Sequence, residues 1–267
     1  MKVTILGTGT SHGIPVVGCN CPVCTSHDFR DRRMRTSVYI EGPGGEKALI
    51  DAGPEFRLQA IKAGISGLDG IFLTHAHADH VHGLDDIRPL CRDKAIPVYG
   101  NEKTITEIRE RFSYIWKDTQ LGGGKPRLTP IVVEQPVKIG NLCFTPIPVK
   151  HGVLDILGWE IGESLLYLTD ASGIPASVGE HLSGNESRRS RVIIIGGLRV
   201  HPHETHFNFE QALDAALGLG AKAIYLTHIC HEHSHADIEE FCRNFRKNHR
   251  LEETEIHPAQ DGLEINL

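Results

Sequence analysis

The sequence of 267 residues contains no run of 18 apolar residues, so no segment is expected to cross a membrane as a helix. The N-terminal stretch Met1 to Gly7 lacks the long apolar core and the small-residue cleavage site of a secretory signal. Basic residues are not in excess, because 28 Lys and Arg stand against 34 Asp and Glu, a formal net charge of -6. Since long nucleic acid is held by a basic surface, this balance argues against such a partner. We expect a cytoplasmic protein with no membrane partner.

Low-complexity tracts, long linkers and heptad patterns are absent as well. The composition is ordinary for a globular protein, with 40% hydrophobic and 23% charged residues. A chain of this length buries roughly three quarters of its unfolded surface and needs no help to form a core. We therefore expect one domain over residues 1–267.

Short apolar runs alternate with helical patterns, which predicts an α/β fold. Strands are expected at residues 3–6, 37–40, 47–50, 70–74, 130–133, 137–139, 142–149, 164–169, 191–195 and 223–227, and helices at 54–63, 104–116, 209–219 and 236–245. Residues 71–80 and 224–233 echo each other, because each is a buried strand that opens into a histidine-rich turn. This echo predicts two similar halves that face each other.

The strongest motif is His75-x-His77-x-Asp79-His80, in a chain that holds 17 histidines. Imidazole nitrogens and carboxylate oxygens are suitable ligands for zinc, manganese or iron ions. On a loop, alternate residues can point to two neighbouring centres. The motif therefore predicts a metal site.

Three later residues, His151, Asp170 and His228, each stand where a strand pattern ends. Loops at the carboxyl ends of parallel strands gather at one edge of an α/β fold. We therefore expect these residues to converge with the histidine motif, although together they span much of the chain.

Cysteine indicates a second site. Seven cysteines are an odd number, and Cys19, Cys21 and Cys24 are crowded into six residues. Without an export signal, this spacing indicates metal binding rather than disulfides. Three thiolates with one imidazole would make a closed, structural zinc site.

These motifs, with Leu6-Gly7-Thr8-Gly9 and the segment from Leu49 to Gly53, resemble the metallo-β-lactamase superfamily. Residues 18–24 and 227–231 resemble its branch of carbon-phosphorus lyase accessory phosphodiesterases, which are phosphoribosyl cyclic phosphodiesterases. The resemblance runs over nearly the whole chain. It implies an α/β fold of the αββα type, in which two facing sheets form a sandwich with helices outside.

The resemblance also implies the metal ligands and two catalytic divalent ions, manganese or zinc. One ion would be held by His75, His77 and His151, the other by Asp79, His80 and His228, with Asp170 bridging both. Asp51 would orient a ligand histidine. His231 would be the fourth ligand of the structural zinc, with Cys230 as a marginal alternative.

The implied activity is hydrolysis of a small, in some members cyclic, phosphodiester of a ribose or nucleotide by a hydroxide that two metals activate. His206 matches the family's general acid, and its neighbours His201 and His203 stay open as alternatives. A homodimer is also left open. Arg30, Arg32, Arg33, Arg35 and Arg199 are candidate phosphate contacts, although arginine runs more often form a solvated face.

Three alternative functions remain open. A tRNA 3′-processing endoribonuclease shares the metal motif, but its long Gly/Pro-rich arm is not visible here and the net charge disfavours it. A thioester or lactone hydrolase is disfavoured by the cysteine loop and by His206. A non-catalytic accessory protein of cofactor biosynthesis is disfavoured by the complete set of metal ligands. A fourth reading, of a different class, is a zinc-dependent binding module, which would not need a bridging Asp170.

Overall fold

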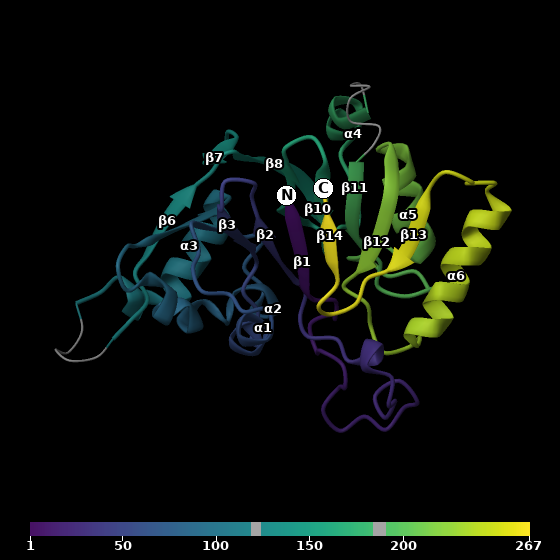
Figure 1. Cartoon of the computed structure of the whole chain (residues 1–267), viewed down its shortest axis with the longest axis horizontal. Helices are drawn as coiled ribbons and strands as arrows, with labels where there is room; N and C mark the ends of the chain where they lie inside the picture. The colour runs from purple at the N-terminus through teal and green to yellow at the C-terminus, as the bar shows by residue number, and fades with distance from the viewer. Residues whose placement is uncertain (119–123, 184–190) are drawn as a thin grey trace.

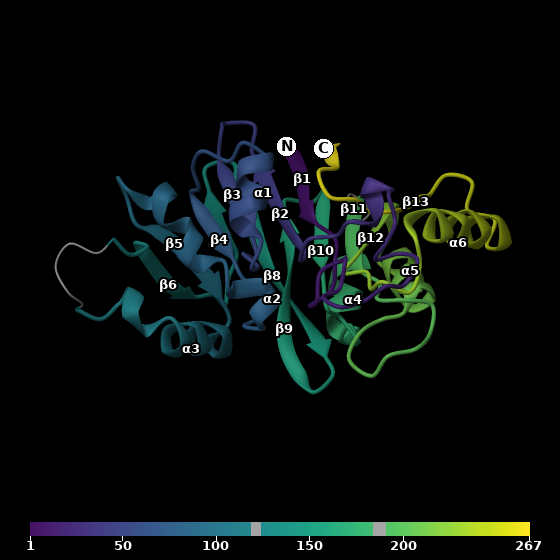
Figure 2. The same cartoon turned by 90° about the horizontal axis from the view of Figure 1, so that it is seen from below.

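The computed structural model describes residues 1–118, 124–183 and 191–267. Two seven-stranded sheets face each other, with helices on the outer side of each (Figures 1 and 2). In order across the first sheet, the strands are β14 (Glu264–Asn266), β1 (Lys2–Gly7), β2 (Ser37–Glu41), β3 (Lys47–Ile50), β4 (Gly70–Phe72), β5 (Ile96–Gly100) and β6 (Leu128–Val132). In the second they are β13 (Glu255–Pro258), β12 (Ala221–Thr227), β11 (Arg191–Gly196), β10 (Leu165–Leu168), β9 (Leu154–Ile161), β8 (Leu142–His151) and β7 (Val137–Ile139).

Helices cover both outer faces, so the predicted αββα sandwich is confirmed. The α-helices are α1 (Phe56–Lys62), α2 (Ala78–Val81), α3 (Glu102–Arg111), α4 (Ala176–Ser183), α5 (Phe209–Gly218) and α6 (His235–Asn248). Short 3-10 helices span Phe29–Asp31, Leu84–Cys91 and Ser113–Ile115. None of the helices in the described ranges is both long and apolar enough to cross a bilayer.

Alternate residues of the central strands supply two different cores. In β11, Val192 and Ile194 pack between the sheets, whereas Ile193 and Ile195 pack beneath α5 and α6. A strand covered on both faces is apolar at every position, which is why residues 192–195 form a continuous hydrophobic run.

The two halves share one topology. In each, three antiparallel strands (β1 to β3, and β8 to β10) are followed by three parallel ones (β4 to β6, and β11 to β13). The sequence echo, however, joins β4 to β12, and the topological counterpart of β4 is β11. The echo therefore marks two buried strands that both end in histidine turns, and not equivalent positions of the two halves.

A half-buried carboxylate holds the C-terminal loop against the N-terminal segment. Asp261 accepts hydrogen bonds from the hydroxyl of Thr8 (2.8 Å) and from the backbone N–H of Met34 (2.7 Å). Burial raises the pKa of Asp261 to about 6. The two hydrogen bonds favour the ionised carboxylate and so limit this rise. Between its unfolded pKa of about 4 and pH 6, the folded chain therefore binds more protons than the unfolded chain.

At pH 4 the protonated form of Asp261 stabilises the folded chain. We expect this contribution to the free energy of unfolding to be lost as the pH rises to 7.5. Asp261→Asn removes this titration and can still accept from Met34. Relative to wild type, the variant should therefore gain about 3 kcal/mol over that pH interval, from a shift of roughly two pKa units. Denaturant unfolding of both proteins at pH 4 and pH 7.5 measures the gain. A difference that does not change with pH would contradict the assigned burial effect.

Candidate metal centre

The candidate ligands of the catalytic metals lie at one edge of the sandwich. His75 follows β4, His151 ends β8, Asp170 follows β10 and His228 follows β12. The structure brings the seven residues together as two adjacent groups, in each of which one ligand atom per residue lies within 4.8 Å of the others. The first group is His75, His77 and His151, and the second is Asp79, His80, Asp170 and His228. All are buried except His77.

Unusual backbone conformations place three of the strand-end side chains. Asp51, Asp170 and His228 have φ angles of 59°, 56° and 54°. This left-handed region costs most non-glycine residues roughly 1–2 kcal/mol, and Asp, Asn and His adopt it more readily than the others. Such strain is concentrated at functional sites. Here it turns the chain sharply at the end of a strand and leaves each side chain at the shared edge.

Hydrogen bonds fix the orientation of two ligand imidazoles. The Nδ1 of His80 donates to Asp51 (2.7 Å), and Asp51 in turn accepts from the backbone N–H and the hydroxyl of Thr74, both at 2.8 Å. The Nδ1 of His151 donates to the carbonyl of Thr205 at 2.7 Å. With Nδ1 occupied in this way, Nε2 is the nitrogen left to bind a metal ion.

The nitrogens that face the centre fit a cation. The Nε2 atoms of His75, His80 and His228 are buried and have no hydrogen-bond partner among the described residues. His228 Nε2 lies 3.1 Å from Asp170 Oδ1, and His80 Nε2 lies 3.3 Å from Asp170 Oδ2. Buried polar atoms without partners are rare in folded proteins. Because these nitrogens converge with carboxylate oxygens, divalent metal ions account for them.

Metal binding requires neutral imidazoles and ionised carboxylates, and the charge states of His75 and Asp170 suit it. Burial lowers the pKa of His75 well below its ordinary value, so this ring is neutral. Burial acts to raise the pKa of Asp170, but the imidazoles of His228 and His80 outweigh it and hold that pKa well below its usual range. For His80, burial acts to lower the pKa, but the carboxylates of Asp170, Asp79 and Asp51 outweigh it and raise the pKa well above its ordinary value, so a metal ion would replace a proton on this ring.

His206 lies on the wall of the same centre. Its Nε2 is 3.1 Å from Asp170 Oδ1, and its ring stacks on His228 with centroids 5.1 Å apart. Burial lowers the pKa of His206, against the effect of Asp170. His203 contacts the outer nitrogen of His206 (3.2 Å) and is exposed, and His201 lines a separate pocket beside the cysteine loop. His206 can also be grouped with His151 and Asp170 as a possible ligand.

A cavity of about 450 Å³ opens above the centre. Its inner wall is formed by the candidate ligands His77, Asp79, His151, Asp170 and His228, together with His206. Its outer wall is formed by Ser11, Val153, Leu154 and Thr205, none of which stood out in the sequence.

The structure also brings Cys19, Cys21, Cys24 and His231 together. The Nδ1 of His231 lies 3.4 Å from each of the three Sγ atoms. Tetrahedral zinc with ordinary bond lengths requires about 3.6 Å between sulfur and nitrogen, so the four donors fit a zinc ion. The backbone N–H of Cys24 lowers the pKa of Cys21 to about 6, which favours its thiolate, whereas burial raises the pKa of Cys24 to about 11. Cys230 lies outside this group.

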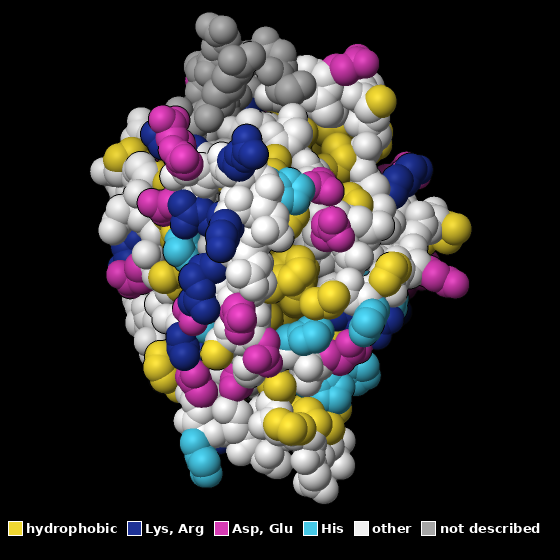
Figure 3. Space-filling model, turned by 90° about the vertical axis from the view of Figure 1, so that its right-hand side faces the viewer, with side chains coloured by type: hydrophobic (Ala, Val, Ile, Leu, Met, Phe, Trp, Pro, Cys, Tyr) yellow, Lys and Arg dark blue, Asp and Glu magenta, His cyan; other side chains and the backbone are white. Residues whose placement is uncertain are grey.

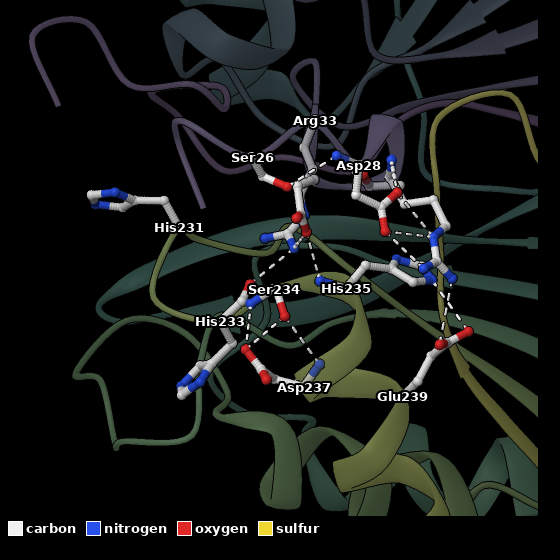
Figure 4. A network of polar contacts seen from close by, with 12 residues as sticks. Ser26, Asp28, Arg33, His231, His233, Ser234, His235, Asp237 and Glu239 are labelled. Carbon is white, nitrogen blue, oxygen red and sulfur yellow. Dashed lines mark hydrogen bonds and ion pairs between the residues drawn. The ribbon is translucent and has the colours of Figure 1, made fainter. Parts of the chain in front are cut away.

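Arg33, which follows the cysteine loop in the chain, lies against the segment from His231 to His235, which follows His228 (Figure 4). Its buried guanidinium donates to the carbonyls of Cys230 (2.5 Å) and His233 (2.9 Å). Asp31 accepts from the backbone N–H of His235 at 2.7 Å. A zinc ion at His231 would therefore add to the hydrogen bonds that already hold the loop after His228 in place beside the metal centre.

Three of the other four arginines that are candidate phosphate contacts form ion pairs with carboxylates. Arg30 pairs with Asp28, Arg35 with Glu55 and Arg199 with Glu232. Arg32 is exposed, in line with a solvated face.

Cys21→Ser should lower the thermal stability and the zinc content more than it changes the chemistry of the protein that remains folded. A structural zinc contributes folding free energy directly. We expect a fall in melting temperature of about 5–10 °C, as a loss of a few kcal/mol gives in a chain of this size. Cys143→Ser, at a half-buried cysteine outside the group, is the control. An unchanged melting temperature with full zinc would exclude a structural zinc here.

Two facing sheets with histidine and aspartate ligands gathered at one edge are the architecture of a metal-dependent hydrolase. The chain belongs to the metallo-β-lactamase superfamily, because the model of a family described as a beta-lactamase superfamily domain matches residues 47–229. A crystal structure described as a new diphosphatase from the PhnP family is 38% identical, with a TM-score of 0.84, over 99% of this chain and 97% of that one.

Two curated proteins are also similar. An octanoyltransferase of Porphyromonas gingivalis is 38% identical over 266 residues, which is 99% of this chain and 51% of that protein. A coenzyme PQQ synthesis protein B of Methylobacterium radiotolerans is 34% identical over 161 residues, which is 55% of this chain and 49% of that protein. The chain thus spans about half the length of these curated relatives.

Proposed function

We propose that the protein is a metal-dependent phosphodiesterase that hydrolyses a small phosphodiester of a ribose or nucleotide, in linear or cyclic form. The observation that supports this most directly is the pair of adjacent ligand groups, with Asp170 placed between His80, His206 and His228. The similarity to a diphosphatase over nearly the whole chain supports chemistry at phosphorus.

In this proposal, each group of ligands holds one divalent ion. His75, His77 and His151 would hold the first, and Asp79, His80 and His228 would hold the second, with Asp170 as a ligand available to both. When bound, such ions supply Lewis-acid activation of water and of a phosphoryl oxygen. Asp51 and the Thr205 carbonyl keep the rings of His80 and His151 turned toward the ions.

His206 is the proposed general acid. An alkoxide is a poor leaving group and needs a proton as the P–O bond breaks. Nε2 of His206 faces Asp170 and the cavity, and Nδ1 is held by the hydroxyl of Thr205 at 2.9 Å. The ring can therefore present a proton at Nε2 to a leaving oxygen bound beside Asp170.

The surface charge favours a small substrate. On the face that carries α6, several Lys and Arg side chains form a column along one side, with Asp and Glu beside it (Figure 3), and the chain as a whole has 28 Lys and Arg against 34 Asp and Glu. A groove for long nucleic acid would need basic residues along the cavity, and the described residues that line it include no Lys or Arg.

A second candidate substrate is a diester of diphosphate, because a protein 38% identical to this one is described as a diphosphatase. Each phosphorus of such a compound carries a single negative charge, as the phosphorus of a phosphodiester does. The same ligands would serve for attack at either phosphorus.

A substrate panel tests the proposal. Metal-replete protein is assayed with bis(p-nitrophenyl) phosphate, a cyclic ribose phosphate, a cyclic nucleotide, a dinucleotide and a nucleoside diphosphate sugar, with a thioester and a lactone as controls. Elemental analysis should give about three metal ions per chain, one of them tightly held zinc. Turnover of phosphorus esters alone is the expected result. Turnover confined to the thioester or lactone, or one ion or none in replete protein, would overturn the proposal.

A further inference from the structure

The turn that joins β8 to β9 places an apolar rim on the catalytic cavity. The turn consists of Gly152 and Val153, and the hairpin projects at the end of the molecule opposite the chain termini (Figure 2). Val153 is 96% exposed and lines the cavity together with Leu154. A single exposed valine is ordinary, but this one stands two residues after the candidate ligand His151.

The rim is held in a fixed position. Gly152 has a φ of 57°, which a two-residue hairpin turn favours at its first position. Its N–H donates to the hydroxyl of Ser172 at 2.8 Å, and the N–H of Ser172 donates to the Lys150 carbonyl at 2.7 Å. A Cβ at Gly152 would lie 2.9 Å from Cγ2 of Thr205, so the turn lies directly against the segment that carries His206. Leu154 packs against the core of the second sheet.

The described residues that line the cavity include no Lys or Arg. The nearby Arg35, which donates to the carbonyl of Ser11, is paired with Glu55. The negative charge of a phosphoryl group would therefore be met at the metal end and not by a basic side chain of the lining. Its organic groups meet the side chains of the outer wall, of which Val153 and Leu154 offer only hydrocarbon.

We propose that Val153 and Leu154 determine specificity by selecting phosphodiesters that carry an apolar or aromatic ester group over diesters with a small one. This inference rests on the proposed phosphodiesterase function. The ester group packs on the methyl groups of Val153 while the phosphorus lies at the metal centre. Because the contact excludes water from apolar surface without hydrogen bonds, it acts on binding and accepts rings of different kinds.

Two diesters with one leaving group test the rim. Phenyl p-nitrophenyl phosphate and methyl p-nitrophenyl phosphate both release p-nitrophenolate and differ only in the retained ester. Val153→Ser should raise KM for the phenyl ester about 5- to 10-fold with kcat within about twofold, and should leave the methyl ester nearly unchanged. Val17→Ser is the matched control, because Val17 is 99% exposed and is not among the residues that line the cavity.

A second measurement does not depend on turnover. In methyl-labelled, metal-loaded protein, diphenyl phosphate should shift the Val153 methyl signals by its ring current, and dimethyl phosphate should not. Two results would overturn the proposed specificity role of Val153. One is Val153 signals that stay unshifted at saturating diphenyl phosphate, and the other is a Val153→Ser variant that behaves as Val17→Ser does on both esters. If wild type hydrolyses neither diester, the phosphodiesterase function fails, and the methyl shift still decides whether the rim binds aromatic ester groups.

Discussion

Asp170→Ala should abolish phosphodiester turnover, a loss of at least about 10³-fold, while the protein stays folded. Within the described ranges, Asp170 is the one carboxylate in contact with His80, His206 and His228 at once, at distances of 3.1 to 3.3 Å. Removing it leaves the imidazoles without the shared anion that would keep two metal ions at their working separation. Steady-state kinetics with elemental analysis of the same sample measures both losses.

A second variant separates chemistry from backbone strain. Asp170 has a φ of 56°, where alanine costs roughly 1–2 kcal/mol, whereas asparagine tolerates this conformation. Asp170→Asn should therefore keep the wild-type melting temperature more closely than Asp170→Ala and still lose activity. Asp155→Asn, at an exposed carboxylate two residues from Val153, should change neither. Activity of Asp170→Asn within a few-fold of wild type would show that the carboxylate is not shared between metals.

The sequence predicted ten strands, and each lies within or overlaps a strand of the structure. The strands it missed have physical reasons. The strand β5 contains Pro97, which a central strand rarely accommodates, and β9 contains Gly158, at which a Cβ would lie 2.4 Å from Leu168. β13 and β14 are short edge strands that extend sheets already formed. Such positions are determined by close packing with distant residues, which local periodicity does not report.

Helix boundaries show the same division between local and distant causes. The helix expected from Thr104 begins instead at Glu102, because Asn101 accepts from the backbone N–H of Thr104 at 2.8 Å and caps it. It ends at Arg111, and a separate 3-10 turn follows. The cap is a sequence signal that the apolar pattern alone overlooked.

The features of the site also divide into those that the sequence indicates and those that only the folded structure reveals. Ligand types at strand ends were visible in the sequence, because parallel strands bring their carboxyl ends to one edge. The left-handed conformations of Asp51, Asp170 and His228 were not, since only the folded neighbours make such strain tolerable. The carbonyl of Thr205 and the rim at Val153 were also invisible, because a backbone acceptor and an exposed valine carry no distinctive pattern.

His206→Ala should reduce the turnover of a ribose ester by about 10²–10⁴-fold, the usual contribution of general acid catalysis. With a p-nitrophenolate leaving group the loss should be far smaller, because this anion departs without a proton. The geometry distinguishes His206 from its neighbours, since its Nε2 faces Asp170 across 3.1 Å whereas His203 touches only its outer nitrogen and His201 lines another pocket.

The comparison between the two leaving groups is measured on His206→Ala, His203→Ala and His201→Ala with the metal content of each sample. For His206→Ala we expect full metal occupancy with a leaving-group-dependent loss, since the proton donor acts on the departing oxygen and not on the ions. His201→Ala should resemble wild type, and His203→Ala should show at most a small loss through the orientation of His206. Because His206 can also be grouped with His151 and Asp170 as a ligand, loss of a metal ion on its replacement would make it a ligand. Equal losses on both substrates with the metals retained would make it a substrate contact instead.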